Sequence, residues 1–379
     1  MNKNRLCIFS IFDKQGIIDD YLIYYLQALS SVVNRIIFVV NGNLAPGEKE
    51  KLEAFSNEIL FRENKGYDAG AHKYALMQLG KEELLKYDEL IMSNDTCYGP
   101  LCPFEEIFEG MEDKGYDVWG LNGYFNMLFS HIQSYFLVFS RKVLEDGAVY
   151  SYFDKYIDEH TENINLIYCS FEVGLFDYLI RTCGYSYGYF CKSPNLDLYE
   201  SSYLYISKYR FPLIKKKIFQ KLGESSLDAW NTLAFVKDST DYNLEFIINN
   251  VKRIYGHDIK VEDIKLCDQE VEEKKLAVAI ISDEDLEAEI EDRGFYIYGT
   301  GMFGYKSYWR FGLNNPLFKG FVISDGRDVG SGELFGLPVM HFSDLQLKED
   351  ERVIVGLGPE FTKELLPVIK RDKRFIRIY

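Results

Sequence analysis

The sequence lacks an apolar run long enough to cross a membrane. No uninterrupted hydrophobic stretch approaches the roughly 18 residues that a membrane-spanning helix needs. The opening MNKNRLCIFSIF has a short basic start, but its apolar run meets Asp13 and Lys14 early and no small-residue cleavage site follows. We therefore expect a first strand here instead of a signal sequence. The expected location is the cytoplasm, with any membrane contact peripheral and at the inner face.

Excess basic charge and paired cysteines are also absent. The chain has 43 Lys and Arg against 59 Asp and Glu, and its net charge of −16 argues against nucleic acid as a partner. Its seven cysteines include no CxxC pair, which favours reduced thiols over a disulfide framework or structural zinc. A hydrophobic content of 47% excludes extensive disorder, and 379 residues suit two or three domains.

Alternating strand and helix patterns predict an α/β fold. Strand-like LCIFSIF (6–12) precedes an amphipathic stretch and strand-like IIFVVNG (36–42), and EILFREN, AHKYALMQLGKEELLKY and ELIMSND repeat the order. This order is typical of a mostly parallel sheet, in which ligand groups collect at the carboxyl ends of the strands. We therefore expect ligand chemistry near Asn41, Asn64 and Asn94.

Three parts are expected along the chain. Residues 1–222 form a large α/β domain, which VWGLNG and SYFLVFS extend with further strands. Residues 223–293 form a helical connecting region with an acidic segment near its end. Residues 294–379 form a small Rossmann-like α/β domain with a closing helix and a final strand.

The last part contains a glycine-rich loop typical of dinucleotide binding. Gly299, Gly301 and Gly304 follow a strand and open a predicted helix, and Asp325 ends the next strand. In the alternative interpretation, the glycines only permit tight strand-to-helix packing. With about 85 residues and no evident catalytic group, this part is expected to be an accessory domain, and NAD is not an expected cofactor.

The stretch ENKGYDAGAH places turn-forming and polar residues at alternate positions. Gly66 and Gly70 permit turns or close approach to a ligand, while Asn64 and Asp68 can hydrogen-bond a base or ribose. The spacing predicts a loop around a nucleotide. The alternative is a strand-to-helix turn in which Asp68 caps a helix that begins near Ala71.

The stretch ELIMSNDTCYGPL delivers polar groups at a strand end. Ser93, Asn94 and Asp95 end the apolar strand before a Gly-Pro turn. One carboxylate there can bind Mg²⁺ or Mn²⁺ together with diphosphate oxygens, because hard cations prefer oxygen ligands. The alternative is a capped turn without a metal.

Two further stretches carry candidate catalytic groups. In HIQSYFLVFSRKVL, His131, Gln133 and Ser134 lead into a buried strand and could point into a cleft, although His131 could equally be a structural histidine. In SFEVGLFDYLIRTCGY, Glu172 is expected at a helix start, where the helix dipole stabilises a carboxylate. The alternative for Glu172 is a solvated surface charge.

NKGYDAGAHKYAL, LIMSNDTCYGPL, HIQSYFLVFSRKVL and, more weakly, STDYNLEFIINNVKRIY together resemble the rhamnan synthesis protein F family. These are glycosyltransferases of polysaccharide assembly whose N-terminal fold looks like GT-A. The resemblance covers roughly residues 5 to 255, and the ordered set of segments is more specific than any one alone.

The resemblance implies roles for individual residues. It implies that Asp95 is the metal-binding carboxylate of the GT-A aspartate motif, although Ser93 stands where a first aspartate is expected. His131, Gln133 and Ser134 would face the sugar or acceptor, and Glu172 would be the general base. The residues implied to bind the donor are Asn41, Asn64, Gly66, Asp68, Gly70, Asn94, Gln133 and Ser134.

The function that follows is a hexosyltransferase of cell-wall polysaccharide synthesis. The family name implies dTDP-L-rhamnose as donor and a saccharide or lipid-linked saccharide as acceptor. In an inverting reaction a carboxylate takes the acceptor proton while Mg²⁺ or Mn²⁺ offsets charge on the departing diphosphate. Two alternatives stay open: an NAD-dependent sugar-nucleotide oxidoreductase or epimerase acting through the C-terminal loop, and a non-catalytic sugar-nucleotide-binding scaffold.

The basic segment SKYRFPLIKKKIFQK (207–221) stands out in an acidic chain. Lys215, Lys216 and Lys217 are expected to meet anionic lipid beside a lipid-linked acceptor, with a solvated helix face as the alternative.

Overall fold

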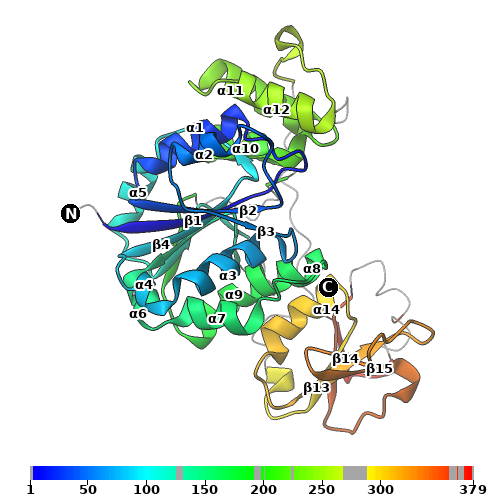
Figure 1. The fold of residues 1–379 in the computed structure, drawn as a ribbon. Coiled ribbons are helices and arrows are strands. Elements are labelled where there is room, and N and C mark those ends of the chain that lie inside the picture. The colour runs from blue at the N-terminus through cyan, green and yellow to red at the C-terminus, as the bar shows by residue number, and fades with distance from the viewer. Residues whose placement is uncertain are drawn as a thin grey trace. The chain divides into compact units, whose positions relative to one another are not determined.

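The computed structural model describes residues 3–124, 131–191, 198–199, 201–222, 226–267, 288–357, 365 and 371–377. The chain divides into two compact units (Figure 1). The first unit comprises Met1–Tyr124, Ile132–Glu162 and Tyr178–Glu272, and the second comprises Phe125–His131, Asn163–Asp177 and Glu273–Tyr379. The predicted acidic segment falls mainly on residues 268–287, which lie outside the described residues, as does most of the predicted closing helix.

A seven-stranded sheet forms the centre of the first unit. Its strand order is β10-β6-β9-β4-β1-β2-β3, in which β3, β2, β1 and β4 are parallel and β9 runs antiparallel to both β4 and β6. These strands are β1 (Arg5–Ile11), β2 (Arg35–Asn41), β3 (Ile59–Arg62), β4 (Glu89–Asn94), β6 (Val118–Gly120), β9 (Phe136–Ser140) and β10 (Tyr187–Tyr189).

Both faces of this sheet are covered. Every residue of β1 and β4 is buried, which explains why these strands read as nearly continuous apolar runs instead of alternating patterns. Figure 1 shows α1 (Asp20–Ser30) and α2 (Lys49–Glu53) on one face of the sheet, and α3 (Tyr67–Leu79) and α7 (Ala148–Tyr156) on the other. The carboxyl ends of the parallel strands therefore open at one edge between two helical layers.

The amphipathic pattern of α1 shows how a helix is fixed to the sheet. Its buried residues recur at helical spacing and pack into the main core with β1 and β4. Tyr25 packs edge-on against Phe9 of β1, with the ring centroids 5.6 Å apart. The buried residues of α1 are Tyr21, Leu22, Tyr25, Leu26 and Leu29.

The remaining elements of the first unit are short or lie towards its C-terminal end. The further strands are β5 (Cys97–Tyr98), β7 (Gly123–Tyr124) and β11 (Ile214–Lys215), and β8 is His131–Ile132. The helices are α4 (Lys81–Leu84), α5 (Phe104–Glu112), α6 (Arg141–Glu145), α10 (Ser202–Tyr209), α11 (Leu227–Ser239) and α12 (Glu245–Tyr255), and the π- and 3₁₀-helical turns are η2 (Tyr178–Thr182), η3 (Lys216–Phe219) and η4 (Val261–Asp263).

Helix α12 belongs to the core of the first unit and secures the loop between β1 and α1. Arg253 Nη2 donates to Asp13 Oδ2 at 2.7 Å and also pairs with Asp19. Asn250 Nδ2 donates to Asp19 Oδ2 at 2.6 Å. The weakest of the recognised segments, STDYNLEFIINNVKRIY, thus has a structural function, because it fixes the first loop at the carboxyl edge of the sheet.

The second unit contains a smaller, mostly parallel sheet. Its order is β14-β15-β13-β12-β16-β17, and the five strands other than β14 are parallel. Counted along the chain, these five lie in the order 3-2-1-4-5, which is also the order in doubly wound nucleotide-binding sheets. The strands are β12 (Phe295–Tyr298), β13 (Phe318–Ile323), β14 (Glu333–Leu334), β15 (Leu337–His341), β16 (Arg352–Val355) and β17 (Phe375–Arg377).

The helical elements of the second unit come from two parts of the chain. One group precedes the connecting region, and the other follows β12. They are α8 (Ile164–Ile167), η1 (Tyr168–Gly174), α9 (Leu175–Asp177), α14 (Met302–Ser307), η5 (Tyr308–Gly312) and η6 (Phe342–Asp344).

The expected α/β class and the expected strands are confirmed, but the helix expected over 71–87 is not a single helix from Ala71. The helix α3 begins at Tyr67 and ends at Leu79, and α4 follows after Gly80. Gly80 has φ +75° and ψ 162°, a conformation that only glycine adopts readily, and it interrupts the helical run.

Candidate functional site

The carboxyl edge of the large sheet gathers several residues that the sequence singled out. We call Ser10, Asn41, Asp68, Asn94 and Asp95 the strand-end cluster. Ser10 and Asn94 are register partners at the ends of β1 and β4, and the Asn41 Nδ2 atom lies 3.5 Å from Ser10 Oγ. All of these residues except the half-buried Asp68 are buried. The parallel topology thus collects amide, hydroxyl and carboxylate groups at one edge.

Asn41 links β2 to the start of α3. Its Nδ2 donates to the backbone oxygen of Tyr67 at 3.1 Å, and its Oδ1 accepts from Arg62 Nη1 at 2.9 Å. Arg62 also donates to the backbone oxygen of Glu159 at 2.8 Å. Burial lowers the pKa of Arg62, and the Glu159 carboxylate acts in the opposite direction. Sequence reasoning missed Arg62, although it ends the strand just before the recognised segment.

Asn94 and Asp68 form a second polar link. Asn94 Nδ2 donates to Asp68 Oδ2 at 2.8 Å, and Asn94 Oδ1 accepts from the Thr96 hydroxyl at 2.6 Å. Asp68 lies in the first turn of α3 and is not the cap of a helix starting at Ala71. The expectation of a loop through ENKGYDAGAH is likewise wrong from Tyr67 onward, because that part is helical. Asn64 lies half-buried in the turn before α3.

The two glycines of the same segment pack against the protein's own chain. Gly66 has φ +66°, donates to the Thr161 backbone oxygen at 2.7 Å, and a Cβ at its position would lie 2.7 Å from Glu159 Cα. A Cβ on Gly70 would lie 2.7 Å from the Lys65 backbone oxygen. Both glycines therefore permit close backbone approach, and their contact with a nucleotide stays a prediction.

Asp95 contacts a lysine. Its Oδ2 atom lies 3.5 Å from Lys216 Nζ, and its backbone oxygen accepts from the Tyr21 hydroxyl at 3.1 Å. Burial raises the pKa of Asp95, while Lys216 and the Phe12 backbone N–H act in the opposite direction. The ammonium group of Lys216 thus provides a counter-charge that offsets part of the effect of burial on this carboxylate.

Lys216 places a positive charge beside Asp95, where the sequence predicts a divalent cation. Within the described part of the chain, no group of three or more His, Cys, Asp or Glu side chains could hold a metal ion. The Lys216 ammonium would also repel a cation bound to Asp95, since unit charges about 4 Å apart interact by about 4 kcal/mol at an effective dielectric constant of about 20. Binding of Mg²⁺ or Mn²⁺ at Asp95 stays a prediction from the sequence.

Lys215, Lys216 and Lys217 of the basic segment do not together form a solvated helix face. Lys215 is buried and belongs to β11, Lys216 is half-buried against Asp95, and Lys217 is exposed. Two of the three lysines therefore point into the protein and are not available to a lipid surface. No helix in the described ranges is both long and apolar enough to cross a membrane.

Gln133 and Ser134 precede β9, beside the end of β4. The Gln133 backbone N–H donates to the Asn122 oxygen at 3.1 Å, and Ser134 is buried. The antiparallel pairing of β4 with β9 ends with Ser93 opposite Phe136, so Gln133 and Ser134 lie just before the first paired residue of β9. Their contact with a donor stays a prediction.

His131 and Glu172 are in polar contact within the second unit. The His131 Nε2 atom lies 3.3 Å from Glu172 Oε2, and both side chains are largely buried. Lys306 lies nearby, with its Nζ 4.8 Å from the centroid of the Tyr168 ring that packs edge-on against His131. Burial lowers the pKa of Lys306, while Cys169 and Glu172 act in the opposite direction. Sequence reasoning missed Lys306.

The expectation that Glu172 lies at a helix start is wrong. The helical run begins at Ile164, where the Asn163 side chain accepts from the backbone N–H groups of Asn165 and Leu166. Glu172 follows much later, inside η1. The helix-dipole argument therefore does not apply to it, because that effect is confined to the first turn. Its role as general base stays a prediction.

The glycine-rich loop of the second unit packs closely on itself. A Cβ on Gly304 would lie 1.9 Å from the Gly299 oxygen, and one on Gly299 would lie 2.6 Å from the Gly356 oxygen. A Cβ on Gly301 would meet no atom within 4 Å. Asp325 Oδ1 accepts from the Ser343 backbone N–H at 2.9 Å, which lowers the pKa of this exposed carboxylate. Tight packing accounts for two of the glycines, and the ligand of the loop stays a prediction.

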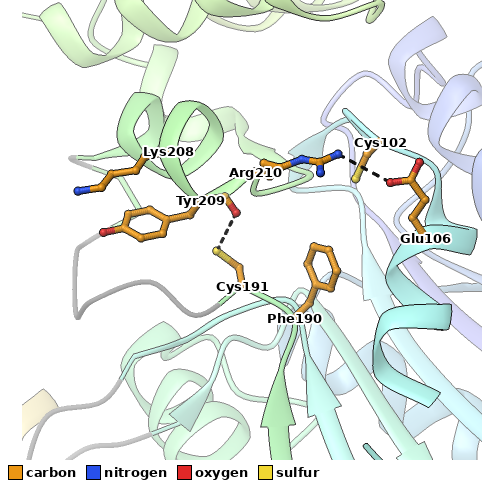
Figure 2. Close-up of a pocket in the computed structure, with 7 residues that line it drawn as sticks. All are labelled: Cys102, Glu106, Phe190, Cys191, Lys208, Tyr209 and Arg210. Carbon is orange, nitrogen blue, oxygen red and sulfur yellow. Dashed lines mark hydrogen bonds and ion pairs between the residues drawn. The ribbon is translucent and has the colours of Figure 1, made fainter. Parts of the chain in front are cut away.

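One pocket of the first unit is lined by none of these residues. Its volume is about 420 Å³ (Figure 2). Figure 2 shows Arg210 extended towards Glu106, with 3.9 Å between Nη2 and Oε2, and Cys191 Sγ donating to the Tyr209 oxygen at 3.6 Å. No predicted site residue lines the pocket. The lining residues are Cys102, Glu106, Phe190, Cys191, Lys208, Tyr209 and Arg210.

Comparison with known protein families shows which family this chain belongs to. Residues 36–282 match the family described as rhamnan synthesis protein F. The match covers well over half of the chain, and the protein belongs to this family. The mostly parallel seven-stranded sheet and the second sheet confirm the α/β class expected from the sequence.

Individual relatives are distant. The chain is 24% identical over 165 residues to the uncharacterized protein y4gN of Sinorhizobium fredii (strain NBRC 101917 / NGR234), covering 43% of this chain and 42% of that protein's length.

Solved structures show only weak similarity. A candidate nucleotide-diphospho-sugar transferase of Desulfovibrio desulfuricans G20 is 15% identical, with a TM-score of 0.29 over 49% of this chain and 79% of the other. A 4-diphosphocytidyl-2C-methyl-D-erythritol synthase is 12% identical, with a TM-score of 0.28 over 42% and 82%. TarS of S. aureus is 11% identical, with a TM-score of 0.28 over 63% and 44%. Scores this low carry no argument about function.

Proposed function

We propose that this protein is a glycosyltransferase that moves a sugar from a nucleoside-diphosphate donor to a saccharide or lipid-linked saccharide acceptor in cell-surface polysaccharide synthesis. The observation that carries the proposal is the strand-end cluster in a member of the rhamnan synthesis protein F family. The family description supports L-rhamnose as the sugar and dTDP-L-rhamnose as the donor. We further propose an inverting reaction.

The cluster can bind a nucleotide through a small set of oriented groups. The amide of Asn41 is bonded to Arg62 and to Tyr67, and the amide of Asn94 is bonded to Asp68. These bonds fix the side chains before a ligand arrives, so less conformational entropy is lost on binding. Asp68, which is half-buried at the start of α3, is proposed to accept a hydrogen bond from the ribose or base.

In the proposed reaction the acceptor hydroxyl attacks the anomeric carbon while the bond from that carbon to the diphosphate breaks. The hydroxyl proton passes to a carboxylate, for which Glu172 is the candidate. Its pairing with His131 gives the carboxylate a fixed orientation within the second unit. Exclusion of water favours transfer over hydrolysis, because water competes with the acceptor for the same carbon.

The test is a binding and transfer assay on the purified full chain with a panel of nucleotide sugars that includes dTDP-L-rhamnose. One donor is expected to raise the melting temperature selectively and to be consumed in the presence of a saccharide acceptor. Asp68→Ala is expected to weaken donor affinity by about 10- to 100-fold, since hydrogen bonds to charged groups contribute about 1.5–3 kcal/mol.

The matched control for this variant is Asp113→Ala, which removes an exposed carboxylate just after α5. Its donor affinity is expected to equal that of the unmodified chain. Binding of no member of the panel would refute the proposed function. Donor binding without transfer to any acceptor would favour a non-catalytic scaffold instead.

A further inference from the structure

Two lysines of the first unit are directed to the carboxyl end of β4 by a short strand pair. The β11 strand pairs antiparallel with β5, with Ile214 opposite Tyr98 and Lys215 opposite Cys97. The backbone N–H of Lys216 donates to the Thr96 oxygen at 3.0 Å, which continues the same register. Backbone pairing therefore sets Lys215 and Lys216, which we call the lysine pair, beside Asp95 and Thr96.

The side chains of the lysine pair are held by polar and aromatic contacts. Lys216 Nζ donates to the Tyr21 hydroxyl at 2.7 Å and lies 3.5 Å from Asp95 Oδ2. Lys215 Nζ donates to Thr96 Oγ1 at 3.1 Å and lies 3.8 Å from the centroid of the Tyr135 ring. Aromatic faces and hydroxyl oxygens stabilise an ammonium group but do not neutralise it.

The two lysines of the pair differ in their partners. Among the ion pairs recorded for the described residues, Lys216 pairs with Asp95 and Lys215 has no carboxylate partner. The nearby carboxylates of Asp13 and Asp19 pair with Arg253 instead. The side chains of Lys216 and Asp95 are only 19% and 10% exposed, and Lys215 is buried. A buried ammonium group without a carboxylate partner is costly unless an anion accompanies it, so an anionic group bound at this edge would stabilise Lys215.

We propose that the lysine pair binds the diphosphate of the nucleotide-sugar donor and supplies the positive charge that a divalent cation supplies in metal-dependent transferases. This inference rests on the proposed function and concerns the same site. Each ammonium group has three N–H donors, of which Lys216 uses two on Tyr21 and Asp95 and Lys215 uses one on Thr96. The remaining donors can bind diphosphate oxygens, and hydrogen bonds between charged partners are short and strong. Asp95 holds Lys216 in place before the donor binds, and transfer needs no divalent cation.

The chemical step remains balanced without a metal. The bond from the anomeric carbon to the diphosphate oxygen breaks, and its electron pair stays on that oxygen. The acceptor oxygen forms the new bond to the anomeric carbon, and its proton passes to a carboxylate of the enzyme. The ammonium groups donate hydrogen bonds to the departing diphosphate, where negative charge develops, and themselves transfer no proton.

Calorimetry on the full chain tests the proposal, with whichever of dTDP, UDP and GDP binds most tightly and with the matching nucleoside as a second ligand. Affinity for the nucleoside diphosphate is expected to be the same in EDTA as in excess Mn²⁺. Lys216→Ala is expected to weaken it by about 10- to 100-fold and to leave nucleoside affinity unchanged. The control variant is Lys217→Ala, which removes the exposed neighbour.

A second variant keeps the test decisive if Lys216→Ala destabilises the fold by leaving Asp95 without its counter-charge. Asp95→Asn removes the competing carboxylate, so affinity for the nucleoside diphosphate is expected to rise. If Asp95 instead carries a metal, affinity will fall in this variant and Mn²⁺ will no longer increase it. Binding that requires Mn²⁺ overturns the inference while the proposed function stands, whereas no diphosphate binding in either buffer overturns both.

A soluble prenyl diphosphate distinguishes the donor from a lipid-linked diphosphate. If Lys216→Ala weakens nucleoside-diphosphate binding, the result supports recognition of the donor, whether or not prenyl-diphosphate binding also weakens. Weakening of prenyl-diphosphate binding alone would contradict it.

Discussion

Replacing Gly66 by alanine is expected to destabilise the first unit strongly. The backbone at Gly66 has φ +66°, and placing an L-residue in the left-handed region costs about 1–2 kcal/mol. The new Cβ would lie 2.7 Å from Glu159 Cα, so one of two backbone segments must shift, at a cost of about 1–3 kcal/mol. That shift would also strain the hydrogen bond from Gly66 to Thr161, which contributes about 1 kcal/mol.

Gly256→Ala provides a matched control. Gly256 has φ +76° and ψ 10°, also in the left-handed region, but a Cβ there would meet no atom within 4 Å. We therefore expect a loss of about 1–2 kcal/mol in this variant and about 3–6 kcal/mol in Gly66→Ala. The assay is hydrogen exchange of the β1 and β2 amides, which reports the free energy of unfolding of the first unit.

Equal losses in the two variants would refute the packing argument. A Gly66→Ala chain of normal stability with reduced nucleotide affinity would show instead that Gly66 contacts the ligand directly.

Two further predictions concern carboxylates. Burial raises the pKa of Asp13, but hydrogen bonds from Arg253 and from the backbone N–H groups of Ile17 and Gln15 outweigh it and lower the pKa overall. Asp13 therefore stabilises the fold above its unfolded pKa of about 4, and this contribution is lost as the pH falls through the lower folded pKa. Asp13→Asn is expected to destabilise the first unit by about 1 kcal/mol at neutral pH and to have no effect in strong acid. Urea unfolding over a pH series will measure the loss. A loss that does not change with pH would contradict the prediction. Glu172→Gln is expected to lower kcat by about 10² to 10⁴ and to leave donor affinity nearly unchanged, because a general base acts only in the chemical step. Calorimetry beside acceptor-dependent turnover tests this, and near-normal turnover would exclude Glu172 as the base.

The central strands of the fold could be predicted from the sequence because their burial leaves a local signal. A strand covered on both faces is a continuous apolar run, and β1, β2 and β4 each end where that run meets a polar residue. Parallel pairing of neighbouring strands then places those ends side by side at one edge of the sheet. The positions of Asn41 and Asn94 at one sheet edge follow from this rule.

The first residue of helix α3 was harder to predict, because its sequence signal is less regular. Good helix formers from Ala71 onward favoured a start there, but Gly66 takes up the left-handed conformation and α3 begins at the next residue. For Glu172 a usable signal existed, because Asn163 is a favourable N-cap residue before INLIYC. A helix start at SFEV would put Glu172 in the first turn, whereas the helical run begins at Ile164 and Glu172 lies inside η1.

The lysine pair could not be located from local pattern. A basic run in an acidic chain is usually solvated, and nothing near Lys215 marks it as buried. Its position depends on pairing between β11 and β5, which lie more than a hundred residues apart in the chain. Contacts of such long range carry no periodic sequence signal, so the local pattern favours a solvated helix face or a membrane-facing segment, and neither predicts the burial of Lys215.

The clamp of Arg253 on Asp13 and Asp19 sets an order of events during synthesis. The two aspartates leave the ribosome some 240 residues before their arginine, since Arg253 and Asp13 are separated by 240 positions. A nascent chain can pair β1 with β2 early, and its first loop can bond to Ala45, Glu48 and Lys51, but Asp13 and Asp19 lack Arg253 until α12 emerges. Any fragment that ends before α12 would carry these two acidic side chains without their clamp.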